Sequence, residues 1–309
     1  MKRLFALFIA AVMLWSCAAF LVSCEDGTQG PPPAQGNKFA YTVNEDNATC
    51  TITGPGEYGL KDVVIPEAID GYKVTGIASK AFFNCSDLTS ITIGNNVTSI
   101  GIDAFYGCSG LKSVYITSLE AWLNVSFESH WSNPCYPGGQ LYINGEPLTA
   151  ITIPDGVTSI GQFAFAGHSY LTAITVPDSV TVIGNQAFYN CDSLTNVSLG
   201  RGVTSIEGGA FFGCSGLKDI VLPDNVTSIG AKAFSQCDSL TSVTLPGKLK
   251  SIGNMAFHVC QSLTSFKFTG TVTQWIEVSK ASNWHATVPA KEITCSNGTA
   301  LLDEWVLNN

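Results

Sequence analysis

Cysteine is the most reactive side-chain type in this sequence, and its positions follow a pattern. The stretches "AFYGCSGL" (104–111) and "AFFGCSGL" (210–217) each place a cysteine between glycine and serine. Such a cysteine could be a nucleophile, a metal ligand or half of a disulfide. The same position, three residues after a phenylalanine, is occupied by Cys85, Cys108, Cys191, Cys214, Cys237 and Cys260, and once by His168.

Other residues with catalytic potential are scattered. The histidines His130, His168, His258 and His285 lie far apart in the sequence. The motifs HExxH and GxSxG and a glycine-rich phosphate loop do not occur. Carboxylates fall mainly at turns such as "PDG" and "PDN", where aspartate suits the turn itself. We therefore expect no enzyme activity, no cofactor and no metal site.

Internal repetition explains the cysteine pattern. The dipeptide Ala-Phe ends at Phe82, Phe105, Phe165, Phe188, Phe211, Phe234 and Phe257. Five of the six gaps are 23 residues long and the other is 60. Leucines that open a Leu-x-x-apolar-x-apolar run divide the long gap into a unit of 23 residues and a variant unit of 37 residues, at 111–147. A fixed period of this length predicts a solenoid, in which each unit buries its apolar side against its neighbours.

The unit "LTSVTLPGKLKSIGNMAFHVCQS" (240–262) contains the expected elements of one coil. Its first six residues alternate as a strand does, and Pro246 ends that strand. The "SIG" that follows is expected to form an extended corner, with Gly253 at a positive φ angle. "NMAFHVC" is expected to form one tight helical turn that directs Phe257 inward. In the variant unit "AWLNVSF" replaces this turn, so Trp122 and Phe127 are expected to take its place in the core.

The repeat changes how the cysteines are interpreted. Neighbouring coils lie about 4.8 Å apart, which is within disulfide range, but side chains in register point in parallel. Zinc needs ligands that converge on one point, whereas a row disperses them. We expect a row of buried thiols, with disulfides between some neighbours as the alternative. The pairing of Cys50, Cys135 and Cys295, which lie outside the row, stays open.

The repeat pattern resembles L-x-x-I-x-I-P-x-x-V-T-x-I-G-x-x-A-F-x-x-C, the leucine-rich repeat (type 5) of the BspA-like bacterial surface protein family. The resemblance implies a β-rich solenoid, a right-handed coil with a parallel sheet on its concave face and short turns or 3₁₀ helices elsewhere. It also implies an N-terminal segment with the first repeat at 39–87, repeats at 88–269 and a C-terminal cap at 270–309.

The first residues predict export. Lys2 and Arg3 precede a nearly wholly apolar run, which is typical of a signal peptide. The run ends in "LVSC", which resembles a bacterial lipobox and implies cleavage after residue 23 and lipidation of Cys24. An ordinary secretory cleavage nearby is the alternative. Residues 24–38 are rich in Gly, Pro and Gln and are expected to be a disordered tether. Acidic residues after Cys24 resemble a signal for export to the outer surface of the outer membrane.

Composition excludes one class of partner. The net charge is −9 and only 13% of residues are charged. Nucleic-acid binding requires a basic surface, and none is visible. The only expected contact with a membrane is the lipid anchor, because no second apolar stretch is present.

Two surfaces are candidates for binding. The first is the concave face, where outward-facing strand residues are small and polar: Ser90, Thr92, Ser113, Tyr115, Thr175, Asn196, Ser198, Asp219, Thr244 and Lys267. The second is the insert loop "FESHWSNPCYPGGQLY" (127–142), which carries Trp131, Tyr136 and Tyr142. Serine and threonine also simply suit exposed strands, and the aromatic residues could instead cover the core where the repeat is interrupted.

These observations favour a surface-exposed binding module. The family resemblance implies attachment to host extracellular matrix or to other surface proteins. A passive surface-coat scaffold and a glycan-capturing lipoprotein are the alternatives.

Overall fold

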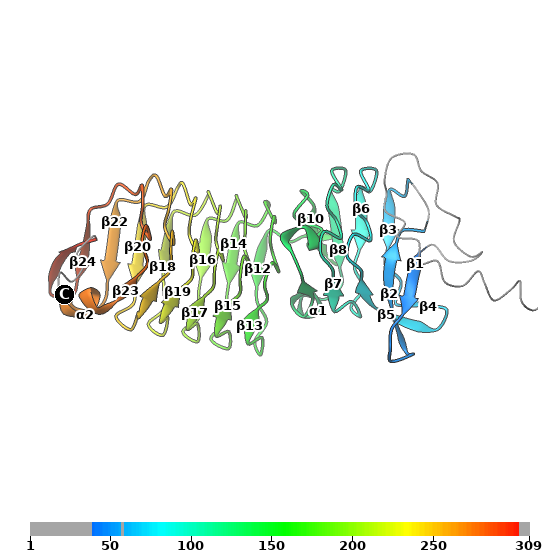
Figure 1. Ribbon diagram of the computed structural model, residues 1–309, viewed down its shortest axis with the longest axis horizontal. Coiled ribbons are helices and arrows are strands. Elements are labelled where there is room, and N and C mark those ends of the chain that lie inside the picture. Colours follow the sequence, from blue (N-terminus) through cyan, green and yellow to red (C-terminus); the bar gives the residue numbers. More distant parts are fainter. Residues whose placement is uncertain (1–38, 57–58, 303–309) are drawn as a thin grey trace, which may run out of the picture.

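Each sequence repeat forms one coil of a β-solenoid. The computed structural model describes residues 39–56 and 59–302. The predicted signal peptide (1–23), the tether (24–38) and Cys24 lie outside the described residues, as do the last residues of the predicted cap. Figure 1 shows the coils stacked side by side along the long axis of the molecule.

One side of each coil carries a longer strand, and these strands form parallel sheets. We call the outward side of these strands the long-strand face. The strands are β3 (Asp62–Val64), β6 (Ser90–Thr92), β8 (Ser113–Ile116), β10 (Gln140–Ile143), β12 (Ala150–Thr152), β14 (Ala173–Thr175), β16 (Asn196–Ser198), β18 (Asp219–Val221), β20 (Ser242–Leu245), β22 (Ser265–Phe268) and β24 (Glu292–Cys295). Their central residues are apolar and point inward, as the alternation predicts.

A second side carries strands of two residues, except for the six-residue strands β2 and β5 at the N-terminal end, and we call it the short-strand face. The strands are β2 (Thr49–Gly54), β5 (Tyr72–Ile77), β7 (Ser99–Ile100), β9 (Ser126–Phe127), β13 (Ser159–Ile160), β15 (Val182–Ile183), β17 (Ser205–Ile206), β19 (Ser228–Ile229), β21 (Ser251–Ile252) and β23 (Ser279–Lys280). From β13 to β23 they form one uninterrupted sheet.

Glycine follows the short strands β7, β13, β15, β19 and β21, but at β21 it is not there for the predicted reason. The φ angle of Gly253 is not positive. A Cβ on Gly253 would instead collide with the backbone of Gly230 and Ala231 in the preceding coil. The prediction of a positive φ angle was wrong, and close approach between coils is what requires glycine here.

The third side contains the Ala-Phe turns, and we call it the turn face. The prediction of a helical turn was wrong, because φ is positive two residues before and two residues after each phenylalanine, as at Gln186 (51°) and Asn190 (56°) around Phe188. Alternate backbone amides donate to the next coil: Phe188 N donates to Ala210 O at 2.8 Å. The amides between them bond within the turn, as Tyr189 N does to Gln186 O at 3.2 Å, so bonds between coils alternate with bonds inside the turn.

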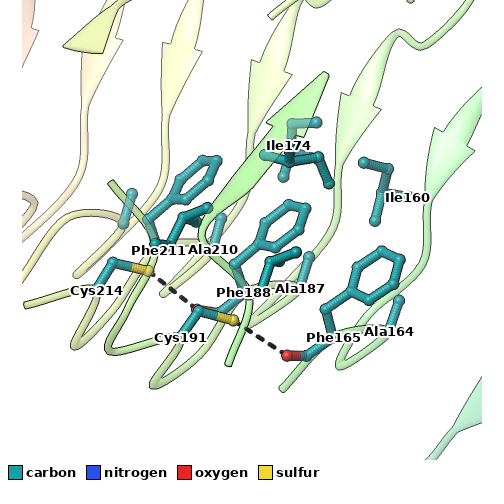
Figure 2. Close-up of a cluster of buried hydrophobic side chains, with 14 of the residues drawn as sticks. Ile160, Ala164, Phe165, Ile174, Ala187, Phe188, Cys191, Ala210, Phe211 and Cys214 are labelled. Atoms are coloured by element: carbon teal, nitrogen blue, oxygen red, sulfur yellow. Dashed lines mark hydrogen bonds between the residues drawn. The ribbon is translucent and has the colours of Figure 1, made fainter. Parts of the chain in front are cut away.

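The hydrophobic core contains rows of stacked aromatic rings. Phe165, Phe188 and Phe211 are fully buried, and neighbouring rings stack with centroids 5.4 and 5.1 Å apart. Figure 2 shows this row with the alanine that precedes each phenylalanine. In the variant unit Trp122 and Phe127 are buried in the same core with their ring centroids 5.1 Å apart, so the prediction that these two residues substitute in the core is confirmed.

Short elements complete the two ends and the variant unit. Strands β1 (Ala40–Val43) and β25 (Gly298–Leu301) pair antiparallel with β2 and β24, and β4 (Ala68–Ile69) and β11 (Glu146–Pro147) form hairpins with β5 and β10. The helical elements are α1 (Leu119–Leu123), the 3₁₀ helix η1 (His130–Ser132) and α2 (Val272–Glu277). None of the helices in the described ranges has the length and apolar character needed to cross a bilayer.

Candidate binding surfaces

The cysteines of the repeat are structural. Cys191 and Cys214 are fully buried free thiols, and each donates a hydrogen bond of 3.2 Å to the phenylalanine carbonyl of the preceding coil, Phe165 O and Phe188 O. Figure 2 shows both bonds as dashed lines. Cys108, Cys237 and Cys260 make the equivalent bond. These five thiols form a row that ties each coil to the one before it.

Burial also makes these thiols unreactive. It raises the pKa of Cys108 to about 12 and that of Cys214 well above the usual thiol range, so the nucleophilic thiolate does not form at neutral pH. Cys85 occupies the same repeat position but is disulfide-bonded, so the row of free thiols begins at Cys108. Within the described ranges, no group of three or more His, Cys, Asp or Glu side chains could hold a metal ion.

The cysteines outside the row are free as well. Cys50, Cys135 and Cys295 are buried thiols in three separate parts of the solenoid. The pKa of Cys135 is raised by its burial. Their pairing, which the sequence left open, is therefore resolved in favour of three separate thiols.

The insert places two of its predicted binding residues in an aromatic cluster on the turn face. Trp131 packs edge-on against Tyr136, with ring centroids 4.5 Å apart, and against Tyr106 at 4.9 Å. Tyr136 also lies near Tyr189 of a regular coil, at 6.0 Å. Both insert rings are only partly exposed, and a Cβ on Gly167 would collide with Tyr136. Trp131 and Tyr136 therefore cover the turn face where the repeat is interrupted.

Tyr142 does not belong to the insert loop. It lies on β10, directly opposite Tyr115 on β8 in a parallel register. The two rings are partly exposed, with centroids 5.0 Å apart. The placement of Tyr142 in the loop was wrong because "GGQLYING" is a strand and hairpin that rejoins the repeat. The structure thus brings Tyr142 together with a residue of the other candidate surface.

The remaining candidate residues lie on the long-strand face in rows along the solenoid. Each strand presents two outward side chains, in register with those of its neighbours, as in Asp219↔Ser242 and Val221↔Thr244. The predicted residues are all exposed or partly exposed: Ser90, Thr92, Ser113, Tyr115, Thr175, Asn196, Ser198, Asp219, Thr244 and Lys267. The surface they form has sparse charge, one aromatic pair and many small hydroxyl groups.

Two apolar residues on this face were not selected from the sequence. Val64 and Val221 are 64% and 63% exposed, at the same outward position of strands β3 and β18. The sequences of these strands are nearly identical, Asp-Val-Val and Asp-Ile-Val. Most other long strands carry Ser or Thr at this outward position, and valine in these strands otherwise points inward. The two valines could therefore have been identified from the sequence as exposed apolar residues.

The sheet of long strands is interrupted at two places. One lies between β10–β11 and β12, where the variant unit ends, and Figure 1 shows the strands on either side of it. The other lies between β16 and β18, where no insertion occurs. The sequence gives no direct indication of the second interruption.

Comparison with known proteins identifies the repeat. The repeat pattern described as "BspA type Leucine rich repeat region" matches residues 57–133 and 139–264 in six copies. No curated protein sequence matches the chain. The family assignment therefore rests on the repeat pattern itself.

Solved structures with the same kind of fold share little sequence. A leucine-rich cell surface protein from Faecalibacterium prausnitzii is 22% identical, with 82% of this chain and 99% of that chain covered, at a TM-score of 0.45. A leucine-rich repeat protein from Bacteroides ovatus is also 22% identical, with 82% and 80% covered and a TM-score of 0.44. The leucine-rich repeat protein of T. pallidum is 25% identical, with 76% and 85% covered, at 0.32.

Proposed function

The chain belongs to the BspA type leucine-rich repeat family, and on this premise we propose that it is a lipid-anchored protein of the bacterial cell surface whose long-strand face binds another protein. In this proposal the lipid is attached to Cys24, and the protein is located on the outer face of the outer membrane. The partner is a host extracellular-matrix protein or another surface protein.

One observation carries the binding proposal: the ring pair Tyr115–Tyr142, in register on neighbouring strands of the long-strand face. Tyrosine provides a large contact area with few rotatable bonds, and tyrosines are enriched among residues that dominate binding energy. Most other outward residues near this pair are small and polar, which suits the rim of an interface. The name of the Faecalibacterium relative, a cell surface protein, agrees with the proposed location.

The test uses the full chain purified in detergent and a panel of host matrix proteins and glycans. We expect binding to at least one matrix protein, and a loss of about tenfold or more in affinity when Tyr115 and Tyr142 are both changed to Ala. Trp131→Ala serves as the control, because this ring is engaged by Tyr106 and Tyr136. Wild-type protein that binds nothing on the panel, or a double variant that binds as well as wild type, contradicts the proposal.

The same experiment separates the alternatives. A glycan-capturing lipoprotein gives a signal on the glycan array instead of the protein panel. A passive scaffold gives no signal on either, while its deletion changes the cell surface. The anchor is tested alone: Cys24→Ser should abolish labelling by a fatty-acid analogue, and unchanged labelling contradicts lipidation at this residue.

A further inference from the structure

A continuous line of aromatic side chains runs along the surface of the turn face. Several coils carry an aromatic, at least partly exposed residue directly after the buried phenylalanine: Phe83, Tyr106, Tyr189 and Phe212. The insert adds Trp131 and Tyr136 between them. Successive ring centroids lie 5.1, 4.9, 4.5, 6.0 and 4.9 Å apart in the order Phe83, Tyr106, Trp131, Tyr136, Tyr189 and Phe212. We call these six residues the aromatic strip.

The aromatic strip presents mainly ring edges to its surroundings. Phe83 stacks on Tyr106, and Tyr189 stacks on Phe212, with interplanar angles of 12° and 7°. The faces of these rings are therefore turned towards one another along the solenoid. A sugar ring binds an aromatic side chain by stacking on its face, so this arrangement does not favour a glycan. What remains exposed is a narrow apolar surface with phenol groups on it.

The aromatic strip is confined to the coils nearer the N-terminus. In the next two coils its position is taken by Ser235 and His258. Ile102, in the same turn as Tyr106, adds an aliphatic side chain that is 50% exposed. The apolar part of the turn face therefore begins at the N-terminal end of the solenoid and stops before the C-terminal coils.

The chain enters the solenoid at the same end of the turn face. Strand β1 pairs antiparallel with β2, and Ala40 lies opposite Gly54 at the end of β2. Strand β2 runs parallel to β5, and Ala78 N, at the start of the next turn, donates to Ile52 O at 2.8 Å. The first described residues therefore lie at the corner where the turn face begins, one coil before Phe83.

The predicted anchor would keep this corner close to a membrane. The predicted tether, 24–38, has 15 residues, and a flexible chain of that length has a mean end-to-end distance of about 20 Å. Of the two ends of the solenoid, the N-terminal end is thus the one held near the lipid. The aromatic strip starts at that end.

We propose that the aromatic strip lies in the headgroup region of the membrane to which the chain is anchored. Tyrosine and tryptophan favour this region because their rings are apolar while the hydroxyl or indole N–H group stays hydrated. The rings already hold one another in place, so the contact costs little conformational entropy. Asp103 and Glu128 lie beside Ile102, so the contact suits zwitterionic rather than anionic headgroups.

This contact rests on the proposed function, since it requires an anchored chain. It adds a second membrane contact to the lipid, which was the only one expected from the sequence. The solenoid then lies along the membrane on its turn face, and the long-strand face with Tyr115 and Tyr142 stays outside the contact.

Fluorescence quenching tests the contact on the full chain in phosphatidylcholine vesicles, where the lipid or an uncleaved signal peptide holds the protein on the membrane. A nitroxide on the lipid headgroup quenches tryptophans at that depth. The emission of Trp131 is obtained as the difference between wild type and Trp131→Phe, and we expect the nitroxide to reduce it.

A pair of double variants shows whether the aromatic strip causes the quenching. Tyr106→Asp with Tyr189→Asp places two carboxylates in the strip and should abolish the quenching of Trp131, because a charge is costly to move into the headgroup–acyl boundary. Tyr115→Asp with Tyr142→Asp is the matched control, since it makes the same charge change in a partly exposed ring pair on the long-strand face. Thermal unfolding checks that both variants remain folded.

The outcomes separate this inference from the proposed function. Quenching that is lost only in the strip variant supports the contact. Unquenched Trp131 in wild type, or equal quenching in the two double variants, overturns it, while binding of a matrix protein through Tyr115 and Tyr142 would still stand. Unchanged lipid labelling of Cys24→Ser together with quenched Trp131 contradicts the proposed anchor and leaves the contact of the strip standing.

Discussion

The regular coils at 171–268 and the insert junction at 119–168 bury the same kinds of side chain but hold their backbones differently. Each boundary between regular coils has rows of backbone hydrogen bonds on at least two faces. At the junction, no backbone bond in the described chain joins 119–139 to 150–168. The hydrophobic core is continuous through both regions.

Side chains take over the missing backbone bonds at the junction. Trp122 Nε1 donates to Ala164 O at 2.9 Å, and Asn133 Nδ2 donates to Phe163 O at 2.9 Å. In the reverse direction, Gln162 Nε2 donates to Phe127 O at 2.9 Å. A backbone ladder is independent of sequence, whereas each of these bonds depends on one residue. In the regular region many backbone bonds should therefore share the coupling between coils, and no single substitution should abolish it. At the junction a single substitution should weaken the coupling.

The largest effect is expected from Phe211→Ala in the regular region. Phe211 is fully buried and stacks on Phe188 and Phe234. Removing the ring should lower the free energy of unfolding by about 3–5 kcal/mol. Hydrogen exchange should rise together in the flanking coils, because backbone ladders couple them. Phe212→Ala, at the half-buried next residue, is the control, and a loss no larger than this control's would contradict the shared-core argument.

Asn133→Ala is expected to act locally at the junction. Asn133 is fully buried; its amide donates to Phe163 O and Ala164 O, and its oxygen accepts from Cys135 N at 2.9 Å. Its loss should destabilise the protein by about 2–3 kcal/mol, because buried backbone groups lose their partners.

Hydrogen exchange of the Asn133→Ala variant should locate the damage. Amides of 119–135 and 161–168 should exchange faster, while those of 210–260 should not change. The exposed Asn254→Ala is the control. A uniform rise along the whole solenoid would show that the junction is coupled as tightly as the regular coils.

The repeat period predicts the coil, because the spacing of Leu, Ile and Phe decides which side chains can be buried together. It also predicts that Trp122 and Phe127 continue the core, since large apolar residues are needed at that point. The turn conformation could not be predicted in the same way. The bonds that determine it, such as Phe188 N to Ala210 O, join residues of different coils and are absent from any single repeat.

The same limit applies to the candidate surfaces. The outward residues of the long-strand face follow from strand alternation and were predicted. Tyr142 was assigned to a loop because the insert has no repeat pattern that would show where its strand begins. The break in the long-strand sheet between β16 and β18 has no counterpart in the repeat, whose spacing stays at 23 residues there.

A pH-dependent loss of stability is expected at the junction. His168 takes the place of cysteine there and is fully buried; its Nδ1 has no hydrogen-bond partner among the described residues. Burial lowers its pKa from 6.5 to about 4. Since the unfolded chain binds the proton more tightly, stability is complete above pH 6.5 and falls as the pH drops toward 4. Between pH 8 and pH 5 the loss should be about 2 kcal/mol.

Denaturant unfolding at a series of pH values measures this effect. The His168→Cys variant carries the cysteine that most other coils have at this position. It should lack the part of the pH-dependent loss of stability that comes from His168. His258→Cys is the matched control, since His258 is less buried and lies in a regular turn. If His168→Cys leaves the pH profile as steep as that of wild type, the acid sensitivity arises elsewhere.

The smallest effect is expected from Cys214→Ala. The substitution removes one buried sulfur and its bond to Phe188 O, and should cost about 1 kcal/mol, because the ladders on both sides keep the coil in place. Thiol labelling at pH 8 then compares the two regions directly. Cys214 should react only as the whole solenoid unfolds, whereas Cys135, which is equally buried at the junction, should react earlier through local opening. If both thiols react at the same rate, the junction opens no more readily than a regular boundary, and side-chain bonds couple the coils as firmly as a backbone ladder does.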